Sequence, residues 1–240
     1  MVQNPKIVTL HPTLDCNHCR LHAICVAGNM TEEETKRLDE AIVHVNPLAQ
    51  GEYLFHQGDR FESLYIIRSG SVKSFMTDAD GIEQIVGFNF PGDLLGLDAI
   101  DEKYHTTSAV ALQHSALCKL SWDDFNKLSQ QCPHFHAQCL TSFSRELIHI
   151  HDMVMAMGQK GVEQKLAIFL LAISQRMKER GFSDKEFILS MSRSDIANFL
   201  GVAAETVSRE FTQLQKEGVI QVDRRQVKID CMDSLKSIAG

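Results

Sequence analysis

The feature that most constrains the fold is a rhythm of glycines between residues 46 and 120. Short segments rich in β-forming residues, such as SLYIIRSGSVKSF and EQIVGFNFPGD, are separated there by turn residues. The glycines recur roughly every ten residues, at Gly51, Gly58, Gly70, Gly81 and Gly92. This spacing is typical of an all-β sandwich or barrel that is built from short strands.

A second pattern begins at about residue 122, where the spacing of apolar residues becomes helical as far as residue 157. Six apolar residues are separated by alternating steps of three and four: Leu140, Phe143, Leu147, Ile150, Val154 and Met157. Such steps form an a/d heptad seam, and no charged residue interrupts it. Spacing alone leaves two interpretations open, which are packing against the chain's own β domain and a coiled-coil dimer with a second copy.

Two helix starts carry a local signature. Residues 31–45 are expected to form a short amphipathic helix, because Thr31 followed by Glu34 is a capping-box pattern. Ser192 followed by Asp195 is a variant of the same pattern.

Residues 161–240 have the order of a winged helix–turn–helix domain. Residues 161–180 are expected to form one helix, and residues 189–218 form two helices around Gly201, which supplies the turn. The segment VIQVDRRQVKI (219–229) predicts two short strands around a charged turn, which is a plausible hairpin wing with basic residues for DNA phosphates.

The second helix of this motif carries side chains that are suited to reading DNA. Its apolar residues are expected to pack inward, which leaves on the other side Glu205, Ser208, Arg209 and Thr212. Arginine can bind guanine bidentately, glutamate can accept from the cytosine amino group, and serine can bond to most base edges. The N-terminal half of this helix meets the bases in such motifs. Any exposed helix also carries polar residues, so the pattern alone does not separate DNA binding from a solvated surface.

Residues 16–25 read CNHCRLHAIC and hold three of the seven cysteines. Cys16, Cys19 and Cys25 have the spacing C-x2-C-x5-C, with two histidines between them. In a reducing compartment, clustered thiols are more often metal ligands or catalytic groups than disulfides. Spacing alone leaves open an iron–sulfur cluster, a zinc ion held by thiolates with or without imidazole, and cysteines that bind no metal.

Composition limits the classes of protein that the chain can represent. No apolar run approaches the ~18 residues of a membrane span, and the first residues lack the pattern of a secretory signal, so we expect a cytoplasmic protein. The formal net charge of −7 argues against non-specific coating of nucleic acid, while a small basic face remains compatible with it. No nucleophile–base pair, phosphate loop or dinucleotide fingerprint is present, so we expect no enzyme.

The segment GVAAETVSREFTQLQKEGVI closely resembles the recognition region of the Crp/Fnr family of transcription factors. Its Glu205-x-x-Ser208-Arg209 resembles the FNR type, the fumarate and nitrate reductase regulator. The segments YLFHQGD, SLYIIRSGSVKSF, PGDLLGLDAI and RGFSDKEFILSMSRSDIANFLG are similar to that type as well, in the same order and spacing. The resemblance covers nearly the whole chain.

The resemblance implies an α+β fold with four parts. An N-terminal β-roll, similar to the jelly roll of cyclic-nucleotide-binding proteins, precedes a long dimerisation helix and a C-terminal winged helix–turn–helix. The implied parts are a cysteine-rich cluster-binding segment (1–29), a β-roll sensor domain (30–132), the dimerisation helix (133–160) and the DNA-binding domain (161–240).

The resemblance also implies partners. The FNR type binds double-stranded DNA as a homodimer, at a palindrome with the half-site TTGAT, and controls anaerobic metabolism. Carried over to this chain, Arg209 reads the guanine, Glu205 the opposing cytosine side and Ser208 a thymine. The loop FMTDADGIEQ (75–84) stands where the family places a contact with RNA polymerase, although its composition is also that of any solvated hairpin turn.

For the cysteines, the resemblance implies a 4Fe–4S cluster whose fourth ligand is Cys118. In the family, oxygen destroys the cluster and the dimer dissociates, which makes DNA binding responsive to oxygen. The alternative is a constitutive dimeric DNA-binding regulator with a structural zinc at the same cysteines. The remaining thiols, Cys132, Cys139 and Cys231, are expected to be ordinary buried or helical residues.

Three positions depart from the family's patterns. Members that bind cyclic AMP carry a glutamate where this chain has Leu97, and an arginine for the phosphate that is missing here, so we expect no cyclic nucleotide. The family commonly carries an acidic residue where this chain has Ile150, which predicts a tighter dimer that persists without the cluster. Ala203 and Ala204 stand where members of the family often place a Ser or Thr cap, just before the turn that contains the glutamate, so we expect a slightly frayed recognition helix.

Overall fold

The computed structural model describes residues 15–158 and 160–240, and it divides into two compact units. The first unit ends at Glu146 and the second begins at Leu147, within the longest helix. The side chains of several residues near the end of that helix lie outside the described part: His149, Asp152, Met153, Met155, Ala156 and Met157. The predictions that concern residues 1–14 of the cysteine-rich segment, and Met157 as a seam residue, therefore fall outside the described part of the chain.

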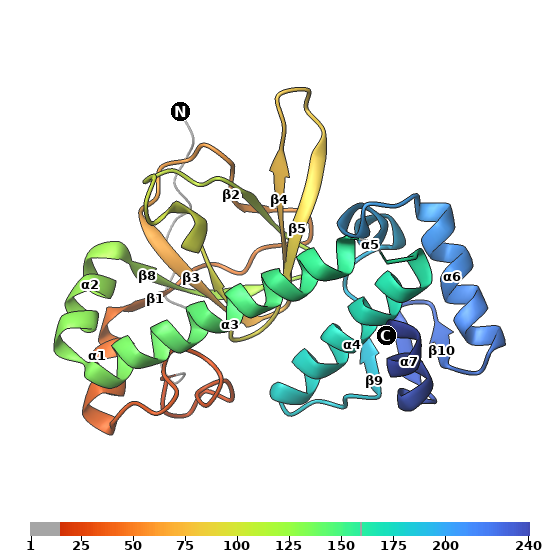
Figure 1. The fold of residues 1–240 in the computed structure, drawn as a ribbon. Coiled ribbons are helices and arrows are strands. Elements are labelled where there is room, and N and C mark those ends of the chain that lie inside the picture. Colours follow the sequence, from red (N-terminus) through yellow and green to blue (C-terminus); the bar gives the residue numbers. More distant parts are fainter. Residues whose placement is uncertain (1–14, 159) are drawn as a thin grey trace. The chain divides into compact units, whose positions relative to one another are not determined.

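The first unit is a β domain with helices before and after it (Figure 1). In chain order its elements are α1 (Glu32–Ala41), β1 (Ile42–His44), β2 (Tyr53–Phe55), β3 (Ser63–Ser69), β4 (Val72–Thr77), β5 (Glu83–Asn89), β6 (Leu94–Leu95), the 3-10 turn η1 (Leu97–Ala99), β7 (Ser108–Ala111), β8 (Ala116–Ser121), α2 (Trp122–Gln131) and α3 (Pro133–Met157).

Two four-stranded antiparallel sheets make up the β domain, in the strand orders β1-β8-β3-β6 and β2-β7-β4-β5. The glycines that were predicted to separate the strands all have positive φ, from 82° at Gly81 to 94° at Gly92. At Gly70 space excludes a side chain as well, because a Cβ there would lie 2.2 Å from Ser115 Oγ. The glycine rhythm therefore marks tight turns, and the predicted β domain is confirmed.

The helix predicted over residues 31–45 is shorter than expected. Its capping box forms: Glu34 N donates to Thr31 Oγ1 at 3.2 Å, and Thr31 N donates to the Glu34 carboxylate at 3.0 Å. The helix ends at Ala41, and the chain continues from Ile42 as strand β1, which pairs with β8. Because β-branched residues are favoured in strands, this pairing overrides continuation of the helix.

One sheet of the β domain carries a helical cover. Helices α1, α2 and the first half of α3 share a core with the sheet β1-β8-β3-β6, and the segment that follows Cys25 joins it. Members of this core include Val26, Ala27, Met30, Leu38, Leu64, Leu120, Phe125, Phe135 and Cys139. The cysteine-rich segment, which has no helix or strand between residues 15 and 29, is therefore anchored by burial.

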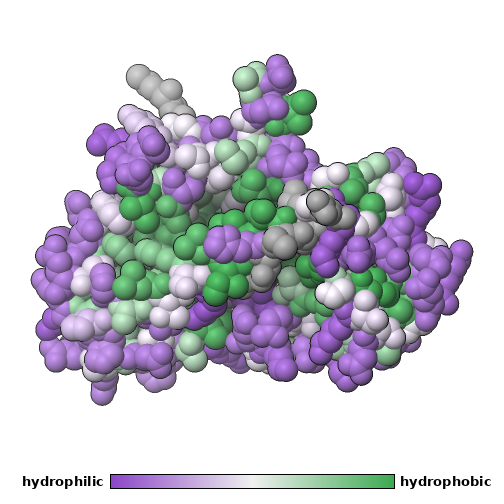
Figure 2. Space-filling view, viewed as in Figure 1, coloured by the Kyte–Doolittle hydropathy of each residue, from purple (hydrophilic) through white to green (hydrophobic). Residues whose placement is uncertain are grey.

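Helix α3 presents an apolar side to solvent in the single chain. Four of the predicted seam residues are exposed: Leu140 (55%), Leu147 (55%), Ile150 (47%) and Val154 (64%). Phe143 differs, because it is partly buried against the core of the β domain. Apolar surface follows this helix in the space-filling view (Figure 2). None of the described helices is long and apolar enough to cross a membrane.

The second unit has the elements that were expected of a winged helix–turn–helix domain. They are α4 (Val162–Glu179), β9 (Glu186–Ile188), α5 (Arg193–Leu200), α6 (Ala204–Lys216), β10 (Ile220–Asp223), β11 (Gln226–Ile229) and α7 (Met232–Ala239). Ser192 caps α5 through Asp195, and Gly201 ends it with φ 65°. The strands β10 and β11 form the predicted hairpin, to which β9 adds a third strand.

Candidate functional site

Helix α6 is held in place by its inner face. Val207, Phe211 and Leu214 are buried, and the guanidinium of Arg193 from α5 lies 3.3 Å from the centroid of the Phe211 ring. Burial lowers the pKa of Arg193 to about 10, which leaves it charged at neutral pH. Since one face is fixed by this core, the other face has a defined orientation toward solvent.

The base-reading candidates Glu205, Ser208 and Arg209 all lie on the exposed face of α6. Their described bonds are local to the helix. Arg209 Nη2 donates to Thr206 Oγ1 at 3.2 Å, and Ser208 Oγ donates to the carbonyl of Ala204 at 2.9 Å. A DNA base can replace either bond without disturbing the core.

The wing beside α6 carries basic residues in three different situations. Arg224 occupies the turn with φ 54° and is exposed. Arg225 Nη1 donates to the carbonyl of Ser190 at 3.4 Å, and Lys228 pairs with Asp230 at 3.1 Å. Arg225 therefore also supports the wing, and Arg224 is the better placed to meet a phosphate.

Four cysteines that are distant in sequence line one small cavity of about 30 Å³ in the first unit. These are Cys16, Cys19, Cys25 and Cys118, and the other lining residues are mainly apolar, with one guanidinium, from Arg68. The residues that the sequence singled out as metal ligands are thus brought together. Cys118 comes from β8, and the other three come from the irregular segment before α1.

The four cysteines line the cavity without forming a ready-made metal site among the described residues. Within residues 15–158 and 160–240, no group of three or more His, Cys, Asp or Glu side chains is placed to hold a metal ion. Burial raises the pKa of the thiols to about 11 at Cys25 and to about 12 at Cys118, and it raises the pKa of Cys16 as well. Thiols lose their protons when they bind a metal.

Polar groups around the cavity lie where they can stabilise cysteine sulfurs that bind a metal. Ala27 N lies 3.4 Å from Cys25 Sγ, and His44 Nδ1 lies 3.6 Å from Cys118 Sγ. The positive charge of Arg68 opposes the effect of burial on the Cys118 pKa. Such donors and charges stabilise metal-bound sulfur and tune the group that it binds.

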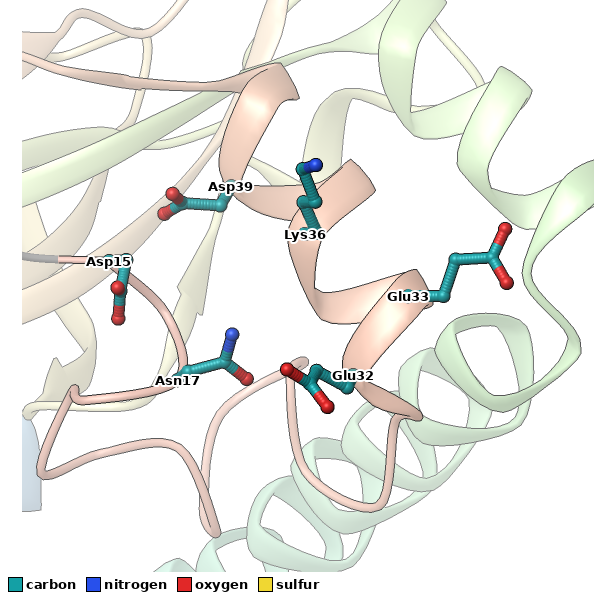
Figure 3. Close-up of a pocket in the computed structure, with 6 residues that line it drawn as sticks. All are labelled: Asp15, Asn17, Glu32, Glu33, Lys36 and Asp39. Atoms are coloured by element: carbon teal, nitrogen blue, oxygen red, sulfur yellow. The ribbon is translucent and has the colours of Figure 1, made fainter.

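An acidic groove lies on the outside of the same segment (Figure 3). Asp15 and Asn17 face α1, which contributes Glu32, Glu33, Lys36 and Asp39. Asp39 connects the groove to the cysteines, because Cys16 N donates to its Oδ1 at 3.1 Å. Its carboxylate adds to the effect of burial in raising the Cys16 pKa.

The two histidines of CNHCRLHAIC do not line the cysteine cavity. His18 Nδ1 pairs with Asp15 Oδ1 at 2.7 Å, and His22 Nδ1 lies 3.0 Å from the carbonyl of Cys16. The donor set at this cavity is therefore four thiols. Among the other cysteines, Cys132 and Cys139 are buried.

The segment that the resemblance aligns with a nucleotide pocket makes several contacts among its own side chains. The hydroxyls of Thr106 and Thr107 both donate to Asp98 Oδ2, at 3.1 and 3.0 Å. The buried ring of His105 stacks on Phe55, with 3.7 Å between the ring centroids.

Sequence reasoning missed several residues around the cysteines. Asp39, His44 and Arg68 surround the thiols, and Gln138 of α3 donates to the carbonyl of Cys25 at 3.3 Å. No local signal marks them, because each contacts a cysteine that is far away in sequence. The fold alone brings them there.

Comparisons with known proteins place these sites in context. Residues 45–132 match the cyclic nucleotide-binding domain family, and residues 164–238 match the Crp-like helix-turn-helix domain family. The fumarate and nitrate reduction regulatory protein of Salmonella typhi is 37% identical over 227 residues, which cover 95% of this chain and 91% of that protein. The transcriptional activator protein anr of Pseudomonas aeruginosa is 37% identical over 240 residues, covering 100% and 98%.

Solved structures with the same fold are also known. FixK2 from Bradyrhizobium japonicum has a TM-score of 0.75 at 25% identity, with 83% of this chain and 98% of that chain covered. A CooA mutant from Carboxydothermus hydrogenoformans has a TM-score of 0.68 at 15% identity, with 84% and 89% covered. The second likeness shows a shared fold.

Proposed function

The chain belongs to the Crp/Fnr family of DNA-binding transcription regulators and is not an enzyme, and from that premise we propose that it senses oxygen through a 4Fe–4S cluster. The cluster is held by Cys16, Cys19, Cys25 and Cys118. In the proposed cycle, the cluster-loaded homodimer binds DNA and the oxygen-exposed protein binds it less well. The observation that carries this proposal is that these four cysteines line one cavity.

The donor set fits an iron–sulfur cluster. Such clusters are ligated by cysteine thiolates, and four cysteines with no histidine line the cavity. When bound, the cluster supplies a redox-active group that is sensitive to oxygen. The thiols must lose their protons on loading, and the N–H groups and positive charges beside them then stabilise the ligating sulfurs.

Loading also joins two parts of the first unit. Cys118 belongs to strand β8, whereas Cys16, Cys19 and Cys25 lie on a segment without helix or strand. Ligands shared by both parts fix that segment against the sheet. Because a ligand that binds only the folded arrangement stabilises it, the loaded first unit is more stable than the empty one.

At the DNA, Arg209 reads the guanine of a TTGAT half-site, Glu205 the opposing cytosine side and Ser208 a thymine. Their exposure on a helix whose other face is buried supports this assignment. In the dimer, two copies of α6 occupy half-sites that lie about one helical turn apart.

The remaining partners follow from the same premise. The homodimer forms along α3, whose apolar residues are exposed in the single chain. The β4–β5 turn meets RNA polymerase; its Ile82 is 65% exposed, and Asp78 Oδ1 orders the turn by accepting from Asp80 N and Ile82 N. The protein acts in the cytoplasm, where it regulates anaerobic metabolism and binds no cyclic nucleotide.

The test compares DNA binding by one preparation before and after exposure to air. Protein purified without oxygen is titrated against a duplex with a TTGAT palindrome, and a duplex with both guanines replaced serves as the control. We expect tight, sequence-specific binding that weakens as the visible absorption of the cluster disappears. Binding that is the same before and after air, with zinc in the protein, would support the constitutive zinc alternative instead.

A further inference from the structure

A single buried amide joins the segment of the cysteines to helix α3. Gln138 Nε2 donates to the carbonyl oxygen of Cys25 at 3.3 Å, and the Gln138 side chain is only 7% exposed. The two residues are 113 positions apart in the sequence, so the bond exists only when the first unit is folded. Two residues further along α3, Leu140 is 55% exposed on the predicted dimer seam.

Gly28 makes this close approach possible. A Cβ at Gly28 would lie 3.0 Å from Gln138 Nε2 and 3.3 Å from the carbonyl oxygen of Cys25. The same Cβ would lie 3.0 Å from the carbonyl oxygen of Ala23. These distances are shorter than ordinary van der Waals contact, so with a larger residue the amide or the loop would have to shift by a few tenths of an ångström. Gly28 is not among the glycines with positive φ, so what requires glycine here is space and not backbone conformation.

Further contacts fix α3 on both sides of Gln138. Cys139 and Phe135 belong to the same buried core as Val26, which follows Cys25 directly. At the start of the helix, His134 Nδ1 lies 2.9 Å from the Glu34 carboxylate of α1. Because a packed helix moves as a rigid element, the position of the Cys25 carbonyl influences where the first half of α3 lies.

We infer that Gln138 is the positioning residue through which a group bound at Cys25 strengthens dimerisation along α3. The inference rests on the proposed cluster. When Cys25 and Cys118 ligate the same group, the Cys25 carbonyl is fixed relative to β8. The hydrogen bond from Gln138 to that carbonyl then restricts the position of α3 relative to β8. Without that group no shared ligand ties Cys25 to β8, so the same hydrogen bond constrains α3 less.

The test uses Gln138→Met, which keeps the length of the side chain and removes the donor. The matched control is Gln175→Met, because Gln175 is exposed and its amide donates to its helical neighbour Glu179 at 3.0 Å. Each full-length protein is prepared with its cluster and after removal of iron by a chelator. Sedimentation over a dilution series gives the dimer dissociation constant of each form, and visible absorption gives the cluster content.

The informative quantity is the ratio of the two dissociation constants, cluster-free over cluster-loaded. We expect Gln138→Met to retain the cluster absorption and to reduce this ratio about threefold to tenfold, the net effect of one hydrogen bond. Gln175→Met should leave the ratio unchanged. A merely structural role for Gln138 would weaken both forms equally and leave the ratio as in the wild type.

A second variant changes the cysteine segment instead of α3, at Gly28 beside the hydrogen bond from Gln138 to Cys25. Gly28→Ala keeps the Gln138 donor but crowds both the amide and the Cys25 carbonyl, so it should weaken this hydrogen bond and reduce the ratio as well. An unchanged ratio in both variants overturns the inference, as does a wild-type ratio of one. Loss of the cluster in Gln138→Met would show that Gln138 builds the loop only, which also overturns it. Wild-type protein without iron overturns the proposed function instead.

Discussion

Helix α6 and the cysteine cavity are assembled in different ways. The proposed base-reading side chains of α6 follow one another within five residues, on a helix whose inner face packs on its own unit. The cavity needs Cys118 from β8 beside a segment that begins about a hundred residues earlier in the chain. Burial raises the pKa of the Cys25 and Cys118 thiols that line it.

The difference teaches where regulation can act. The proposed base-reading side chains already face solvent in the single chain. The cysteines come from two distant parts of the first unit, and a group bound by all four would fix these parts to each other. We therefore propose that a signal enters at the cysteines and reaches DNA through the dimer helix, and each of the following predictions tests one part of this contrast.

The largest effect is expected at the shared ligand. Cys118→Ser removes the thiol that ties the segment to β8, so the variant should lose essentially all cluster absorption, while its second unit unfolds as in the wild type. Iron analysis and thermal unfolding measure these two results. Cys231→Ser is the control, because Cys231 lies in the second unit and away from the cavity. If Cys118→Ser retains its iron, Cys118 is not a required ligand and the cavity does not depend on β8 as we propose.

The next largest effect is expected at the apolar seam of helix α3, where we propose that the dimer forms. Ile150→Asp places two like charges on the seam and removes apolar burial of about 1.5 kcal/mol or more from each copy. The dimer dissociation constant should therefore rise at least about 100-fold, as measured by sedimentation of the cluster-free protein. His151→Asp adds the same charge at an exposed position off the a/d pattern and should change the constant little. A monomeric wild type in the cluster-free form would refute the predicted persistence of the dimer.

A smaller, sequence-dependent effect is expected on α6. Arg209→Ala should weaken binding to the TTGAT site by about 10- to 100-fold, the contribution of one bidentate base contact, and should abolish the preference for guanine. Arg224→Ala, at the proposed phosphate contact of the wing, should weaken binding to all sequences equally. Fluorescence anisotropy with matched duplexes separates the two. If Arg209→Ala keeps its guanine preference, the assignment of this residue is wrong.

The smallest effect is expected at the start of α6. Ala203 is the N-cap and offers no side-chain bond to the helix. Ala203→Ser should therefore stabilise the second unit by about 1 kcal/mol, and slow hydrogen exchange in the first turn of α6. Ala204→Ser, one position inside the helix, is the matched control and should not do so. An unchanged exchange rate in Ala203→Ser would mean that the first turn is already held by other contacts.

Local rules explain how far the sequence alone predicted this fold. Turn glycines, the capping boxes at Thr31 and Ser192, and the apolar face of α6 are signals carried by neighbouring residues, and all of them formed. The end of α1 was missed because pairing of Ile42 with β8 is a long-range contact. In the same way, spacing indicated three clustered cysteines, but only the resemblance to a family pointed to Cys118.

The surroundings of the cysteines were beyond sequence reasoning for a related reason. Asp39, Arg68 and Gln138 act on thiols or carbonyls that are tens of residues away, and none belongs to a recognisable motif. Phe143 likewise follows the seam spacing and yet packs partly on the β domain. Periodicity shows which residues share a helix face, but not which partner covers each of them.

The most direct measurement is the visible absorption and metal content of the full-length protein purified without oxygen. We expect a coloured protein with about four iron and four sulfide ions per chain, and no colour after air removes them. Zinc at about one per chain in a colourless protein would contradict the proposed cluster, as would iron that remains bound when Cys118 is replaced by serine.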